Sequence, residues 1–254
     1  MNSTTFTKKR KIKLWALIFW LFVWQGLSIC IGQEILLASP LSVLNRLISL
    51  ASGLDFWRSI AFSLQRIVLG FFLATFIGII FATFAARFHL IEQLLAPLIL
   101  FVNSTPVASI IILLLIWFSS GHLAMIISFL MVLPIIYTNI LSGIKSTDSK
   151  LLEMADVFEV PIGKRITYIY ISQVLPYFKA ACLIGLGLSW KAGIAAEVIG
   201  IPRGSIGFDL HQARIFLLTA DLFAWTITII ILSTLFERVF MFLLTQAINK
   251  LERL

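Results

Sequence analysis

Charged residues are scarce in this sequence. Asp, Glu, Lys and Arg make up only 13% of its 254 residues, about half of their share in soluble domains. A soluble fold needs a polar coat around its core, yet 60% of this chain is hydrophobic. The composition therefore excludes a soluble globular domain and predicts an integral membrane protein.

Other absences narrow the class of membrane protein. The only cysteines are Cys30 and Cys182, and the three histidines are scattered, so neither a disulfide framework nor a metal site is indicated. The sequence contains no phosphate-binding G-x-x-x-x-G-K-[ST] loop and no cluster of a nucleophile with a base. We expect no catalytic residue, no metal, no bound cofactor and no enzymatic activity in this chain.

Long apolar runs, without the alternation of a membrane β-barrel, predict about six membrane-spanning helices. The predicted spans are Leu14–Gln33, Ile67–Ala86, two helices within Gln93–Ile144, Val174–Ile199 and Leu222–Leu244. The turn inside the longest run is expected at Ser119-Ser120-Gly121, which leaves two helices of about 26 residues. No room remains for a separate soluble domain, so residues 1–254 are expected to form one transmembrane domain.

Basic residues are unevenly placed along the chain. Lys8, Lys9, Arg10, Lys11 and Lys13 lie directly before the first span, and such a run fixes its end of a membrane protein in the cytoplasm. With six spans, the cytoplasmic segments then hold twelve Lys and Arg residues and the outer loops hold four. We expect both termini in the cytoplasm, and we assign the net charge of +8 to this topology rather than to a nucleic-acid partner.

Small residues recur every four positions in two predicted spans. Their glycines are Gly70 and Gly78 in the second span, and Gly185 and Gly193 in the fifth. Small residues at this spacing allow membrane helices to approach closely. We interpret the stripes as helix packing within the chain; the alternatives are a contact between two subunits or a surface that slides during gating.

The longest polar segment between spans runs from about residue 145 to residue 173. Asp148 is the residue type of a helix N-cap, and it predicts a short helix after it. Pro161 and Gly163 are expected to break that helix. A second short amphipathic piece then leads into the fifth span, so the segment predicts two bent helices beneath the membrane.

One face of this segment is predicted to be apolar. Leu151, Ala155 and Phe158 follow helical spacing, and Glu153 belongs to an acidic flank beside them. Such a surface suits a soluble partner. The alternative is a helix that rests on lipid headgroups, although anionic lipid would repel the acidic flank.

Three charged residues lie within or near predicted spans: Arg66, Lys191 and Glu197. A charge at mid-bilayer costs about 2.5–3.5 kcal/mol on insertion scales, so these side chains are expected to face a cavity or a partner. One interpretation makes them part of the route of an anion. The other pairs Lys191 or Arg66 with Glu197 or Asp221 to hold helices together.

The segment Asp148–Ala155, followed by Leu175-Pro176, resembles the EAA loop of ATP-binding-cassette importer permeases. The chain from about Ser59 to Arg238 resembles the nitrate/sulfonate/taurine branch of that family in particular. The matching residues, in order, are Ser63-Leu64-Gln65-Arg66, Gly70-Phe71, Gly78, Pro97, Pro106, Ala108, Trp117-Phe118, Gly121, Trp190-Lys191 and Ala195-Ala196-Glu197.

The loop departs from the family pattern at three places. Glu159 stands where the family has a glycine, six residues after the glutamate of the motif. Ile171-Ser172 replaces the first Leu-Pro pair, and Met154 replaces the second alanine of the motif. We expect the bend of the loop to be shifted toward Pro161 and Gly163.

The resemblance implies an all-α membrane protein of the type I importer class, with the coupling loop between its fourth and fifth helices. Two separate ATPase subunits would bind ATP and Mg²⁺. A second copy of the chain would complete a homodimer in the bacterial cytoplasmic membrane, and an extracytoplasmic binding protein would deliver the cargo. The residues expected to couple to the ATPase are Leu151, Glu153, Ala155, Phe158, Pro161 and Gly163.

The cargo expected from Arg66 and Lys191 is a small anion or zwitterion, such as nitrate, a sulfonate or taurine. One alternative within the family is a pyrimidine or vitamin precursor. A different class of function is a secondary transporter or channel without an ATPase. Such transporters often show internal repeats and mid-membrane carboxylates, and neither is recognisable in this sequence.

Overall fold

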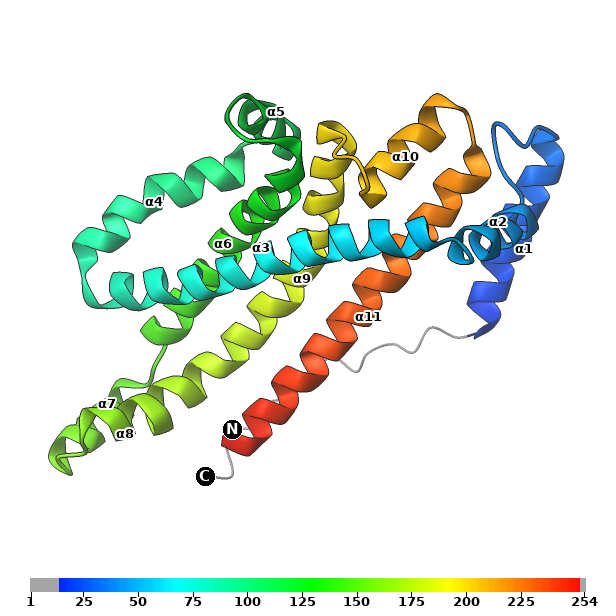
Figure 1. Cartoon of the computed structure of the whole chain (residues 1–254). Coiled ribbons are helices and arrows are strands. Elements are labelled where there is room, and N and C mark those ends of the chain that lie inside the picture. The colour runs from blue at the N-terminus through cyan, green and yellow to red at the C-terminus, as the bar shows by residue number, and fades with distance from the viewer. Residues whose placement is uncertain (1–13, 252–254) are drawn as a thin grey trace.

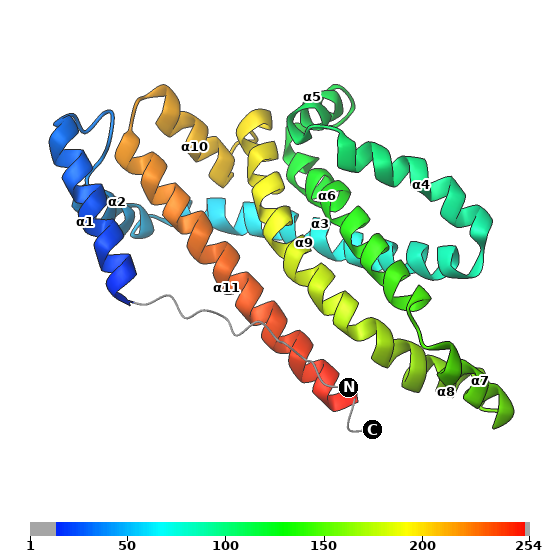
Figure 2. The same cartoon turned by 180° about the vertical axis from the view of Figure 1, so that it is seen from behind.

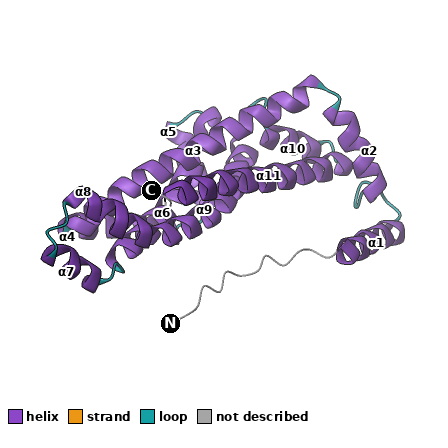
Figure 3. Cartoon of the chain, turned by 90° about the horizontal axis from the view of Figure 1, so that it is seen from below, coloured by secondary structure: helices purple, strands orange, loops and turns teal. Residues whose placement is uncertain are grey.

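The computed structural model describes residues 14–251 of the chain, and the basic segment 1–13 lies outside them. The described residues form helices and short loops, without a strand (Figure 3). The elements are α1 (Leu14–Ile31), α2 (Pro40–Ala51), α3 (Leu54–Arg87), α4 (His89–Ser104), α5 (Val107–Trp117), α6 (Ser120–Lys145), α7 (Ser149–Val157), α8 (Ile162–Arg165), the π-helix η1 (Ile166–Tyr170), α9 (Ile171–Gly200), α10 (Ile206–Ile215) and α11 (Thr219–Leu251).

Five stretches of helix are long and apolar enough to cross a membrane: α1, α3, α6, α9 with the helical turns before it, and α11. The bent pair of α4 and α5 raises the number to six if it counts as one span, so the predicted all-helical class with about six spans is confirmed. Helix α3 begins at Leu54 rather than near Ile67. Charged residues such as Asp55 lie in its first turns without ending it, so the length of the charge-free stretch underestimates the length of this helix.

The prediction of one helix of about 26 residues from Gln93 to the turn near Ser119 is wrong, because two shorter helices occupy this stretch. Helices α4 and α5 meet at an angle of 108°, and the break lies at Thr105 and Pro106. Proline has no N–H to continue a helix and disfavours helical dihedrals in the residue before it. Thr105 accordingly has extended dihedrals, φ −87° and ψ 132°, and α4 ends there.

Helix α6 occupies the centre of the molecule, packed between α3 and α9 (Figure 1). Helices α7 and α8 and the end of α11 lie toward one end of the molecule, and α5 and α10 lie toward the other (Figures 1 and 2). Helix α1 stands at the edge, beside α2. Helices α6 and α9 thus connect these two ends of the molecule.

Backbone contacts at glycine bring α3 and α9 close to α6. A Cβ atom on Gly70 of α3 would lie 2.3 Å from the carbonyl oxygen of Met125 of α6. A Cβ atom on Gly193 of α9 would lie 2.6 Å from Ile67 Cγ1 and 2.8 Å from Ser128 Oγ. Gly78 and Gly185 of the predicted stripes also lie against α6. The geometry therefore supports packing within the chain for these glycines.

We expect Gly70→Ala to destabilise the protein by about 1–3 kcal/mol, because a backbone oxygen of α6 must move to admit the methyl group. The measurement is the midpoint of thermal unfolding of the purified protein in detergent. Gly26→Ala in α1 is the matched control, since its Cβ would meet nothing within 4 Å. Equal midpoints for the two variants would contradict the close packing of α3 on α6.

Candidate functional site

The loop between α6 and α9, residues 146–165, contains the two short helices that the sequence predicts. Asp148 precedes α7, and its carboxylate accepts a hydrogen bond from the backbone N–H of Lys150 at 2.9 Å. The predicted N-cap is confirmed. Pro161 is the residue before α8, but Gly163 lies inside α8, so the predicted break at Gly163 is wrong.

The bend of this loop lies at Glu159. The N–H of Glu159 donates to the carbonyl of Asp156 at 3.1 Å, and the N–H of Val160 donates to that of Ala155 at 2.9 Å. This pair of bonds is a Schellman motif, in which the residue after the C-cap takes left-handed dihedrals. Glu159 has a φ of 47°, a conformation that glycine adopts without strain.

Arg165 of α8 holds the end of α7. Its Nε donates to the carbonyl of Val160 at 2.6 Å, and another guanidinium nitrogen donates to that of Ala155 at 3.1 Å. The guanidinium also forms an ion pair with Asp156. Asp156 is thus the acidic residue of α7 that Arg165 binds, and Glu153 has no hydrogen bond or ion pair to the described residues.

Apolar side chains project from the bend. Phe158 is 74% exposed and Val157 is 79% exposed, and Met154 and Ile162 are also exposed. We call these four residues the loop's apolar patch. Ala155, by contrast, is 1% exposed, so its predicted place on an exposed face beside Phe158 is wrong: the end of α7 folds against Arg165 and covers it.

The loop continues into α9 through a π-helix, η1. The hydroxyl of Ser172 donates to the carbonyls of Tyr168 and Ile169 at 3.0 and 3.2 Å, so Ser172 supports the first turn of α9 where the family has a Leu-Pro pair. Helical segments of this kind are rare and are often found at functional positions. The loop is therefore joined to the long helix without an intervening coil.

Glu197, at the other end of α9, is fully buried. Its Oε2 accepts a hydrogen bond from the Ser63 hydroxyl at 2.7 Å and one from the Gly207 N–H at 3.2 Å. The Ser63 oxygen in turn accepts from the N–H of Ile206 at 3.0 Å. The first N–H groups of any α-helix have no partner within the helix. In α10, these hydrogen bonds supply the partners.

Packing around this carboxylate is tight. A Cβ atom on Gly207 would lie 2.3 Å from the Cβ atom of Glu197, so only glycine fits where α10 meets α9. The geometry makes Glu197 a capping residue that joins α3, α9 and α10. The start of α10 could have been predicted from Gly204 followed by Ser205, because serine is a common N-cap residue. Hydropathy alone does not reveal it.

Arg66 and Lys191 do not meet Glu197 in an ion pair. Arg66 donates to the carbonyl of Gly121 in the first turn of α6, and its guanidinium lies 3.3 Å from the centre of the Phe62 ring. Lys191 is exposed on α9, and no partner for it lies among the described residues. The three predicted pathway residues are thus not assembled into one site within a single chain.

Asp221, the other predicted partner, belongs to a different pair. The guanidinium of Arg46 in α2 donates to its two carboxylate oxygens at 2.5 and 2.9 Å. These hydrogen bonds raise the pKa of Arg46 above its ordinary value. The pair fixes α2 to the start of α11, and the predicted pairing of Asp221 with Arg66 or Lys191 is wrong.

Among residues 14–248, no group of three His, Cys, Asp or Glu side chains is placed to hold a metal ion. The site is a bent loop with an exposed apolar patch. It is joined to α9, which runs toward the opposite end of the molecule. Residues 67–252 match the family described as the binding-protein-dependent transport system inner membrane component. The chain belongs to this family.

Its relatives support the predicted branch. The chain is 27% identical to the taurine transport system permease protein of Escherichia coli over 84% of its own length and 80% of the relative. It is 24% identical to a putative aliphatic sulfonates transport permease protein of Bacillus subtilis over 80% and 74% of the two chains. It is 30% identical to the bicarbonate transport system permease protein of Synechococcus elongatus over 63% and 59%.

The protein is therefore a permease subunit of an ATP-binding-cassette importer, with the type I permease fold. Members of this family are inner-membrane components that work with an ATPase and a substrate-binding protein. Such a permease subunit takes part in transport and is not itself an enzyme. The resemblance to the nitrate/sulfonate/taurine branch is confirmed.

The family position of Glu159 provides a test of the loop geometry. We expect Glu159→Gly to stabilise the loop by about 1 kcal/mol, because a non-glycine residue pays roughly that much for left-handed dihedrals. Slower hydrogen exchange of residues 149–165 would measure it. Glu159→Val, which makes the same conformation less accessible, should accelerate exchange there; identical exchange in both variants would contradict the left-handed bend.

Proposed function

We propose that this permease couples to its ATPase through the apolar patch of the α6–α9 loop. The observation that carries the proposal is the exposure of Phe158 at a bend that Arg165 makes rigid. The Arg165 hydrogen bonds hold the backbone on both sides of Phe158, and an aromatic side chain that enters a pocket of the partner can contribute much of the energy of an interface. The patch consists of Met154, Val157, Phe158 and Ile162.

The remaining coupling residues take different parts in this proposal. Glu153 lies beside the patch and has its carboxylate available for a charged hydrogen bond to the ATPase. Leu151 is half-buried and supports α7, as Ala155 does from beneath. Pro161 and Gly163 shape the second arm of the bend. ATP and Mg²⁺ would be bound by the ATPase alone, and both termini would lie on its side of the membrane; α11 ends toward the same end of the molecule as the loop.

We further propose that two copies of the chain form the pathway, each with one ATPase. An exposed or half-exposed face of α9 carries Ala180, Ile184, Gly187 and Lys191 at helical spacing. A lysine that faced lipid at this depth would cost about 2.5–3.5 kcal/mol. A second copy that faces it across an aqueous route would remove that cost, so Lys191 supports a homodimer whose α9 helices line the pathway.

The proposed cargo is a small anion or zwitterion. The relatives named above carry taurine, aliphatic sulfonates or bicarbonate according to their names, and Lys191 adds a positive charge to the proposed route. Arg66 adds to the positive potential near the α5–α6 turn, although its donors already bind carbonyl groups. Glu197 is enclosed by α3 and α10 and has no part in cargo contact.

The double change Glu153→Ala and Phe158→Ala tests coupling. We expect normal membrane insertion, because both residues lie outside the spans, together with loss of ATPase recovery or of ATP-driven uptake. Removal of an interface anchor typically costs about 2 kcal/mol or more, roughly a thirtyfold loss of affinity. The measurements are pull-down of the ATPase with the permease and uptake in reconstituted vesicles.

Phe88→Ala is the matched control for this change. Phe88 is an exposed aromatic residue at the α3–α4 corner, outside the apolar patch, so its removal should leave ATPase recovery unchanged. Normal recovery and normal uptake in the Glu153/Phe158 double variant would show that the patch is not the coupling surface.

The cargo prediction is tested on the cognate binding protein and on Lys191. We expect taurine, an alkanesulfonate, nitrate or bicarbonate to raise the melting temperature of the binding protein, and Lys191→Gln to slow uptake of that solute more than Lys191→Arg. The alternative cargo is a pyrimidine or vitamin precursor. Stabilisation by that neutral or cationic class alone would exclude an anionic cargo, and uptake without any ATPase would favour a secondary transporter.

A further inference from the structure

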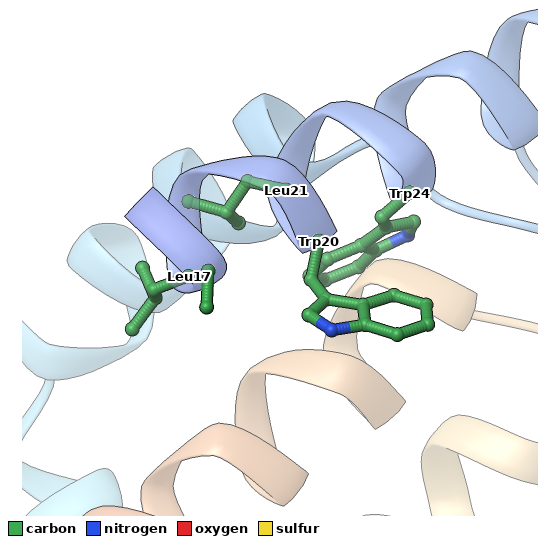
Figure 4. Close-up of a pocket in the computed structure, with 5 residues that line it drawn as sticks. Leu17, Trp20, Leu21 and Trp24 are labelled. Carbon is green, nitrogen blue, oxygen red and sulfur yellow. The ribbon is translucent and has the colours of Figure 1, made fainter. Parts of the chain in front are cut away.

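Two apolar hollows lie beside α1, whereas the buried polar atoms that lack a partner lie in α9. The smaller hollow, of about 430 Å³, is lined by alanine, leucine and tryptophan side chains, Trp20 and Trp24 among them (Figure 4). In the described part of the chain, two buried side-chain atoms have no hydrogen-bond partner: Nε1 of Trp190 and Oε1 of Glu197. The carboxylate oxygen is the more costly of the two, because it belongs to a charged group. Glu197 is therefore the side chain that calls for a further partner.

Arg66 of α3 lies within electrostatic range of that carboxylate. It follows Ser63, which donates to Oε2 of Glu197, by three residues, so the two side chains lie on the same side of α3. The opposite charges of Arg66 and Glu197 attract one another. The guanidinium nevertheless donates to two neutral oxygens, the carbonyls of Gly121 in α6 and of Phe62 in its own helix.

The guanidinium has to leave its present place to reach Oε1. It lies 3.3 Å from the centre of the Phe62 ring, and its Nε donates to the Gly121 carbonyl. That bond fastens the first turn of α6 to α3. A guanidinium binds a carboxylate more strongly than it binds a carbonyl, because both partners are then charged. Movement of Arg66 to Glu197 would therefore give Oε1 its missing donor and would free the start of α6.

The backbone next to Glu197 is strained. Ile201 ends α9 with a φ of 51° and a ψ of 48°, and these left-handed dihedrals are unfavourable for a β-branched residue. Such strain is found at segments that switch between conformations. Gly200 packs tightly on α6, since a Cβ atom there would lie 2.6 Å from Leu123 Cδ1. A movement of the end of α9 therefore also displaces the first turns of α6.

We propose that Arg66 is a switch with two partners. In the described conformation it binds the Gly121 carbonyl. In a second conformation, which releases the strain at Ile201, it binds Oε1 of Glu197, and the start of α6 is freed from α3. The cap on α10 stays in place, because it uses Oε2. One side chain thus links the end of α9 to the α5–α6 turn, residues 118–124.

Hydrogen exchange of the purified full-length permease in detergent tests this switch without an ATPase or a cargo. Glu197→Gln keeps an acceptor for the cap on α10 but removes the charge that attracts Arg66 away from Gly121. We expect exchange in residues 118–124 to slow about fivefold, the effect of one hydrogen bond on a local opening equilibrium. A Glu197 that served only as a cap would affect exchange at the start of α10 alone.

Two further variants test the direction and the route of this effect. Ser63→Ala removes one donor from Oε2 and leaves the carboxylate freer to bind Arg66, so exchange in residues 118–124 should accelerate. In the double variant Arg66→Gln with Glu197→Gln, exchange there should equal that of Arg66→Gln alone, because Glu197 acts on the turn only through Arg66.

Asp221→Asn is the matched control. It also replaces a carboxylate by an amide, but this carboxylate binds Arg46 of α2. We expect faster exchange in α2 and unchanged exchange in residues 118–124.

Four results would overturn the proposal. The first is unchanged or faster exchange of the α5–α6 turn in Glu197→Gln. The second is unchanged or slower exchange of that turn in Ser63→Ala. The third is an effect of Glu197→Gln that persists when Arg66 has been replaced by glutamine. The fourth is equal slowing of the turn in Asp221→Asn, which would show that the effect does not depend on Glu197.

Discussion

The contact of α3 and α9 with α6 determines the arrangement of the other elements. Lipid offers helices no hydrophobic reason to associate, so their packing depends on close van der Waals contact. Gly70 and Gly193 provide it by allowing backbone and side-chain atoms of α6 to approach to distances that a methyl group would block. Because α6 and α9 both run from one end of the molecule toward the other, fixing them to one another also fixes the α6–α9 loop relative to α10 at the opposite end.

Each end of α9 is held by charged groups that bind backbone atoms. At one end Arg165 binds carbonyls at the end of α7, and at the other Glu197 binds an N–H at the start of α10. Both charges face helix ends, where the unpaired groups and the helix dipole are complementary to them. The helical connection from the loop to α10 through α9 departs from regular α-helix at η1 and contains a proline, Pro176.

The sequence predicted the elements that depend on local chemistry. The bounds of α1 and α6 follow from apolar length, and the start of α7 follows from the capping side chain of Asp148. It did not predict features that depend on distant partners. Glu197 is a cap because Ser63 and α10 meet it in space, and Ala155 is buried at the end of α7 whose carbonyls Arg165 binds from α8. The α4–α5 break could have been predicted from Pro106, because proline disfavours helical dihedrals in the residue before it. Hydropathy does not change at this position and therefore gives no sign of the break.

The three charged residues of the predicted pathway illustrate this limit. A charge in a membrane helix must find a partner or an aqueous surface, and the sequence cannot say which. Within one chain, Glu197 Oε2 accepts hydrogen bonds from Ser63 and Gly207, although its buried Oε1 has no hydrogen-bond partner among the described residues, and Arg66 binds carbonyls and the face of Phe62. Lys191 stays exposed on α9 in the isolated chain. Of the three, it is therefore the residue whose charge has no partner among the described residues, and the one that the proposed cargo pathway would take from this chain.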